Sequence, residues 1–266
     1  MKKLIEFKKQ RELADVLTDS FAFIRTEFKP LITTILKISG LYLLLFLIAM
    51  VFYIYSADNM FDFGIGQDIK ASDNLPLMFG SLLMFMFFGL LAYTFANSTV
   101  LHYIKSYANN DGQVNFEDVK LNVKNTFWGF LGLSILKWIT LMVAILFCVL
   151  PILYFMVPMF LVFCIYVFEQ KNASSAYGDS FTLIKGEFWM TLATIIVIGL
   201  IVMIASYAFG MPAAIYSIVK MGIFSGEIDP ANMQDFVDPV YIFLNVISYL
   251  FKFLLNLILT VSSAFI

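Results

Sequence analysis

Charge is scarce in this 266-residue chain: only 14% of its residues are Asp, Glu, Lys or Arg, whereas 61% are apolar and 17% aromatic. Soluble domains are about 45–50% apolar and about 25% charged. The net charge is −2, so no general attraction to nucleic acid is expected. This composition excludes a soluble enzyme, a disulfide scaffold, a disordered tail and a nucleic-acid binder.

Acidic residues are absent from five long apolar runs: Leu31–Tyr55, Leu75–Ile104, Phe127–Phe168, Phe188–Phe209 and Val240–Ile266. A helix needs about 20 apolar residues to cross a hydrocarbon core. The run Phe127–Phe168 is long enough for two crossings, and Pro151 supplies the break between them. Because backbone amides in hydrocarbon must be bonded within their own segment, these spans are helices. We therefore predict an all-α membrane protein, a single polytopic domain over residues 1–266 with six transmembrane helices.

Groups that carry catalysis are also scarce. The single histidine, His102, lies without the further His or Cys ligands that a zinc site needs. The two cysteines, Cys148 and Cys164, both lie in apolar runs at different expected depths, which argues against a disulfide. Paired acids, a Ser–His arrangement and a phosphate-binding glycine loop are likewise not visible. The sequence predicts no catalytic residue, no metal site and no cofactor, and the protein is not expected to be an enzyme.

The basic residues are distributed unevenly among the loops. Most lie in Met1–Pro30, Lys105–Thr126 and Glu169–Glu187, whereas Ser56–Asn74 and Gly210–Pro239 hold only Lys70 and Lys220 among eight acidic residues. Cytoplasmic loops of membrane proteins are rich in Lys and Arg. Acidic residues interrupt the N-terminal segment, so it does not resemble a secretory signal. Both termini are therefore expected in the cytoplasm, with the chain in the inner (plasma) membrane.

A ten-residue segment recurs along the chain. Asp19–Phe28 reads DSFAFIRTEF, Asp179–Phe188 reads DSFTLIKGEF, and Asp118–Phe127, DVKLNVKNTF, is a weaker copy. Each copy precedes an outward span, which predicts three parallel units over approximately residues 10–104, 112–168 and 172–266. Each unit would consist of an amphipathic cytoplasmic helix followed by a transmembrane hairpin.

The first copy has a recognisable apolar face. Its residues recur at spacings of three and four: Leu13, Val16, Leu17, Phe21, Ile24 and Phe28. Such helices would lie in the inner interface with their bases toward anionic headgroups. They either cap the bundle and orient the spans, or sense the membrane and dock partners. The charged candidates for docking are Asp19, Arg25, Asp118, Lys124, Asp179 and Lys185.

The copy at Asp179–Phe188, the third in chain order, carries a family resemblance. The residues that carry the resemblance are Glu169, Ala176, Asp179-Ser180-Phe181 and Lys185-Gly186-Glu187-Phe188-Trp189. The segment resembles a loop of bacterial six-helix membrane proteins related to the membrane domain of glycerophosphodiester phosphodiesterases. The layout of the chain is similar to that family over most of its length, but the motif covers about twenty residues. The 266 residues hold no phosphodiesterase domain after the last span, so the resemblance implies a membrane layout and not that activity.

Two lysines lie deep within predicted spans. Lys137 and Lys252 are costly in hydrocarbon, and such residues are functional candidates. Lys252 belongs to a polar stripe at helical spacing: Asn245, Ser248, Lys252, Asn256, Thr260 and Ser263. The stripe either packs helices together or lines a cavity for an anionic ligand.

The sequence is compatible with two functions. The first is a non-enzymatic inner-membrane subunit or scaffold for partner proteins, with the charged helices as its docking surface. The second is a carrier or flippase for an anionic lipid or small anionic solute, in which Lys137 and Lys252, with Asn245, Ser248 and Asn256, would bind the ligand. The expected partners are membrane lipids and other membrane or cytoplasmic proteins, and no nucleic acid.

Overall fold

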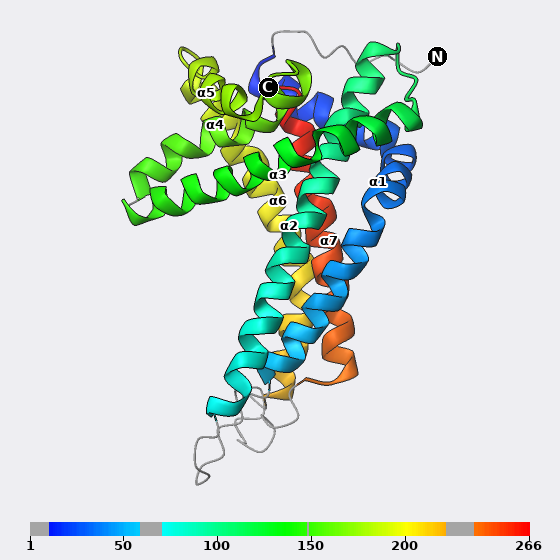
Figure 1. The fold of residues 1–266 in the computed structure, drawn as a ribbon, viewed down its shortest axis with the longest axis vertical. Coiled ribbons are helices and arrows are strands. Elements are labelled where there is room, and N and C mark those ends of the chain that lie inside the picture. Colours follow the sequence, from blue (N-terminus) through cyan, green and yellow to red (C-terminus); the bar gives the residue numbers. More distant parts are fainter. Residues whose placement is uncertain (1–10, 59–70, 148, 222–236) are drawn as a thin grey trace. The chain divides into compact units, whose positions relative to one another are not determined.

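The computed structural model describes residues 11–58, 71–147, 149–221 and 237–266. The regular structure in these ranges is helical throughout and includes no strand. Its helices are α1 (Leu13–Asp58), α2 (Ala71–Asn109), α3 (Phe116–Leu146), α4 (Val149–Phe168), α5 (Ala173–Leu183), α6 (Phe188–Lys220) and α7 (Pro239–Ser263). Figure 1 traces them in chain order.

Six of these helices are long and apolar enough to cross a membrane, and α5, with 11 residues, is the exception. The prediction of an all-α, multi-pass membrane chain with six apolar helices of membrane length is confirmed at this level. The break predicted near Pro151 is also found, because α3 ends at Leu146 and α4 begins at Val149. Cys148 lies outside the described residues.

The chain divides into two compact units. Unit 1 comprises Met1–Gly40, Tyr93–Val202 and Asn256–Ile266, and unit 2 comprises Leu41–Ala92 and Met203–Leu255. Helices α1, α2, α6 and α7 each contribute residues to both units, whereas α3, α4 and α5 belong to unit 1 alone. The three predicted sequence units and their parallel arrangement stay predictions.

The repeated segment does not form a separate helix in each copy. The first copy is continuous with the apolar part of α1, and the second with that of α3. Only the third copy is interrupted, because Ile184–Glu187 form turns between α5 and α6. Gly186 adopts a positive φ of 103° in this interruption, a conformation that the β-branched Thr26 at the matching position of the first copy would not readily adopt.

Unit 1 is built around α4. This helix packs against α3 and α5, which lie beside it in Figure 1. The Phe130 ring of α3 stacks on the Phe163 ring of α4 with centroids 4.5 Å apart, and Tyr166 meets Phe130 edge to face. Most side chains in the second half of α4, from Leu161 to Val167, are buried.

Unit 2 is held by aromatic side chains. Phe85 of α2 stacks on Phe46 and Tyr53 of α1, with centroids 5.2 and 5.6 Å apart. Phe209 of α6 stacks on Phe251 of α7 at 4.2 Å. Aromatic pairs of this geometry add to the energy of apolar burial.

Candidate functional site

The second position of the repeated segment is buried in all three copies. Ser20, Val119 and Ser180 each have 0% of their surface exposed. The residue four positions earlier is also buried in the first and third copies, as Val16 and Ala176. These two copies therefore bury the same i and i+4 positions of their helices, which orients the rest of each segment.

The apolar face predicted for the first copy is only partly the buried one. Val16 is buried as expected, but Phe21 and Phe28 are exposed, and Phe23 and Glu27 are buried in their place. The Phe23 ring contacts the rings of Tyr103, Tyr107 and Phe265, which fixes the rotation of α1. Exposed phenylalanines are acceptable where lipid rather than water surrounds a helix.

The first position of the segment forms an ion pair in two copies. Arg11 Nε donates to Asp19 Oδ2 at 2.7 Å, and Lys171 Nζ donates to Asp179 Oδ2 at 2.8 Å. In both cases the base lies eight residues before the acid. Asn110 occupies the corresponding place in the second copy, where Asp118 is exposed. Asp19 and Asp179 are thus engaged within unit 1.

Lys171 has a second carboxylate partner. Its Nζ lies 2.6 Å from Glu169 Oε2. The hydrogen bonds to Asp179 and Glu169 raise the pKa of Lys171 above its ordinary value. This exposed cluster holds the loop before α5 in place, but exposed ion pairs add little to stability.

The seventh position is basic and exposed in every copy, as Arg25, Lys124 and Lys185. Within the described ranges, none of the three forms an ion pair or a hydrogen bond through its side chain. All three belong to unit 1. The structure shows no contact between them, so they are separate basic positions on one unit.

In two copies the residue at the ninth position, Glu27 or Thr126, contacts the same part of α2. Tyr103 Oη donates to Glu27 Oε2 at 2.9 Å, and His102 Nε2 lies 3.0 Å from Thr126 Oγ1. The matching Glu187 of the third copy is exposed. His102 and Tyr103 are therefore contacted by α3 and α1 respectively, and the contacts of His102 fit a packing role.

The part of α2 within unit 1 is a buried polar helix. Asn97 accepts a hydrogen bond from Thr260 of α7, and Thr99 hydrogen-bonds with Ser39 of α1 at 3.3 Å. Ser98 Oγ and His102 Nδ1 are buried without a hydrogen-bond partner among the described residues. Asn97-Ser98-Thr99 is a polar triplet within an apolar run, and these three residues were not among the predicted site residues.

Lys137 is held by aromatic side chains inside unit 1. Its Nζ donates to Tyr93 Oη at 3.1 Å and lies 5.0 Å from the centre of the Phe163 ring. Cation–π contacts and a hydroxyl acceptor stabilise an ammonium group in apolar surroundings. These contacts explain how α3 accommodates the charge.

Lys252 lies in unit 2, where α6 and α7 meet. Its Nζ is 5.4 Å from the centre of the Tyr249 ring and would be 3.4 Å from a Cβ added at Gly210. Ser248 is buried beside it, and Asn245 Nδ2 donates to Tyr241 O at 2.9 Å. Asn256 is exposed, so not every residue of the predicted polar stripe is buried.

Among the described residues, no group of three or more His, Cys, Asp or Glu side chains could hold a metal ion. Comparisons with models of known protein families, with curated proteins and with solved structures found no match to this chain.

Proposed function

We propose that this chain is a non-enzymatic membrane subunit or scaffold that presents its repeated segments to an acidic partner protein. The observation that carries the proposal is the seventh position, where Arg25, Lys124 and Lys185 are all basic and all exposed. The second position is buried in the same copies. A segment that is anchored on one side and basic on the other is suited to docking.

Two acids of the repeated segments are already engaged in ion pairs. Asp19 and Asp179 pair with Arg11 and Lys171, so these acids do not neutralise the base six residues later. An exposed ion pair between proteins contributes about 0.2–1 kcal/mol. Complementary surface charge mainly sets partner choice and association rate.

The resemblance of the chain to bacterial six-helix membrane domains supports a further part of this proposal, the location of the chain. It supports an inner-membrane location with both termini, and the three basic positions, on the cytoplasmic side. The excess of Lys and Arg in the corresponding loops favours the same orientation.

The test is co-purification of partners from gently solubilised membranes with the triple variant Arg25→Glu, Lys124→Glu and Lys185→Glu. Reversing three exposed charges should lower partner recovery roughly tenfold, because three exposed ion pairs of about 0.2–1 kcal/mol each are lost. The control is Lys29→Glu with Lys120→Glu, which reverses exposed charges in unit 1 outside the seventh position. Equal recovery with the triple variant and the control would contradict the proposal.

The carrier hypothesis has weaker support. Lys137 contacts Tyr93 and Phe163, and Lys252 contacts the Tyr249 ring, so both lysines are engaged within the described residues. Lys252 and Ser248 lie in unit 2, where Gly210 gives the lysine room. A carrier for an anionic lipid or solute would therefore have to displace the existing contacts of these lysines.

A further inference from the structure

The contacts near the connection between α3 and α4 indicate how deep this helical hairpin lies in the membrane. In a six-span arrangement, the residues that join α3 to α4 lie on the opposite face from α5. Tyr154, near the start of α4, would then lie far from α5. The part of α4 between Tyr154 and Phe168 is about 21 Å long at 1.5 Å per residue.

Tyr154 instead lies beside the end of α5 and the start of α6. Its ring centre is 6.4 Å from that of Phe181 and 5.7 Å from that of Phe188. The neighbouring Phe155 contacts Phe181 as well, at 5.8 Å. All of these residues belong to unit 1.

A contact from α3 leads to the same conclusion. Thr140 Oγ1 hydrogen-bonds with Tyr177 Oη of α5 at 2.9 Å. Thr140 lies well along α3, which begins at Phe116. Both helices of the hairpin therefore remain beside α5 close to the point where they are joined.

The charged residues in and beside α5 indicate how deep in the membrane these contacts can lie. Asp179 pairs with Lys171 in an exposed cluster, and Lys185 and Glu187, just before α6, are exposed. If Tyr154 lay at the opposite face, these charges would have to enter the hydrocarbon. Each charge at the centre of a bilayer costs about 2.5–3.5 kcal/mol, so this arrangement is disfavoured.

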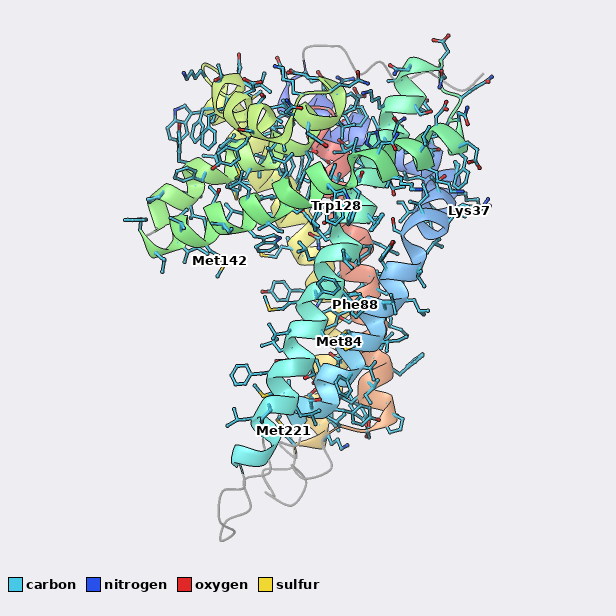
Figure 2. The ribbon with its side chains drawn as sticks, in the orientation of Figure 1. Lys37, Met84, Phe88, Trp128, Met142 and Met221 are labelled. Carbon is cyan, nitrogen blue, oxygen red and sulfur yellow. The ribbon has the colours of Figure 1, made fainter. Side chains whose placement is uncertain are left out.

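The outer surface of α3 is too apolar to face water. Six exposed residues form one stripe along the helix, opposite its buried residues: Leu121, Trp128, Ile135, Ile139, Met142 and Leu146. Figure 2 shows Met142 projecting away from the hairpin. Beyond Lys124 the only charge of α3 is Lys137, whose side chain contacts Tyr93 and Phe163. A continuous apolar surface of this kind needs an apolar partner.

We infer that the α3–α4 hairpin does not cross the membrane but lies in the leaflet on the α5 side, with the exposed stripe of α3 against lipid acyl chains. Four helices, α1, α2, α6 and α7, then make the crossings. An even number of crossings keeps both termini on one side. The inference does not depend on the docking proposal, since it rests on the contacts of α3 and α4.

The three tryptophans, Trp128, Trp138 and Trp189, provide a direct test. Single-tryptophan chains, with the other two changed to Phe, are placed in vesicles of phosphatidylcholine brominated at different acyl positions. We expect the three quenching depths to agree within about 5 Å, one helical turn. In a crossing hairpin, Trp138 would lie about 15 Å deeper than Trp128, which is ten residues earlier, and this result would overturn the inference.

Two further outcomes are decisive. If no bromolipid quenches Trp128 and the chain is dimeric, a second copy covers the stripe and the lipid assignment is wrong. If the tryptophan variants do not fold, Phe147→Cys and Lys185→Cys are compared in a chain with Cys148→Ser and Cys164→Ser. With Lys185→Cys labelled from one side by an impermeant maleimide, reaction of the Phe147→Cys chain from the opposite side overturns the inference. Reaction of Phe147→Cys from the same side, or its protection from both sides, agrees with the inference.

Discussion

Gly129 of α3 lies close against Tyr166 of α4. A Cβ at this position would lie 2.1 Å from Tyr166 Oη and 2.7 Å from Tyr166 Cζ. The ring cannot simply move aside, since Tyr166 Oη donates to Thr126 O at 3.3 Å and its ring packs on Phe130. Glycine is required here for space, because α3 is helical at this point.

We therefore expect Gly129→Ala to lower the free energy of unfolding by about 1–3 kcal/mol through overpacking. Denaturant titration of the detergent-solubilised protein measures the change. Gly132→Ala is the matched control on the same helix, because a Cβ there meets no atom within 4 Å. That variant should be neutral or stabilised by up to about 1 kcal/mol, the helix preference of alanine over glycine. Equal destabilisation of the two variants would contradict the packing of α3 on α4.

At the scale of elements, the start of α7 depends on Asp238. Asp238 Oδ1 accepts a hydrogen bond from Tyr241 N at 2.7 Å, as a helix N-cap does. Asp238 Oδ2 accepts from Lys220 Nζ at 2.8 Å and also from Tyr216 Oη. The hydrogen bond from Lys220, followed by those from Tyr216 and Tyr241, holds the pKa of Asp238 well below its ordinary value.

A lowered pKa gives stability that is complete above the unfolded-state pKa of about 3.9 and is lost as the pH falls toward the folded-state value. Hydrogen exchange in the first turn of α7 should therefore become faster as the pH drops below about 4, after correction for the intrinsic exchange rate. Asp238→Asn keeps an oxygen acceptor but cannot ionise, so its corrected exchange should not change in this range. A similar acid dependence in both chains would show that Asp238 is not responsible.

The elements were predictable where the physical signal was strong. Runs without acids located the six apolar helices, and Pro151 located the break between α3 and α4. The continuity of α1 was not predicted, because a sequence pattern does not show whether an interfacial helix ends before its span begins. The rotation of α1 was also missed, since the burial of Glu27 depends on Tyr103, a residue distant in sequence.

At the scale of the whole molecule, the positions of the charged residues could be predicted only in part. The three exposed bases follow from the repeat, but the ion pairs of Asp19 and Asp179 and the aromatic contacts of Lys137 required the structure. The two compact units were not predictable either, because each of four helices contributes to both. Hydropathy alone also does not distinguish a crossing hairpin from one that lies in a single leaflet.

The six apolar helices support a multi-pass membrane chain, and we propose that it crosses an even number of times with both ends on the cytoplasmic side. The most direct measurement is protease digestion of short tags, one at each terminus, in sealed vesicles of known orientation. The account predicts that both tags are digested in inside-out vesicles and that both are protected in right-side-out vesicles. Digestion of one tag with protection of the other, or digestion of both in right-side-out vesicles, would contradict it.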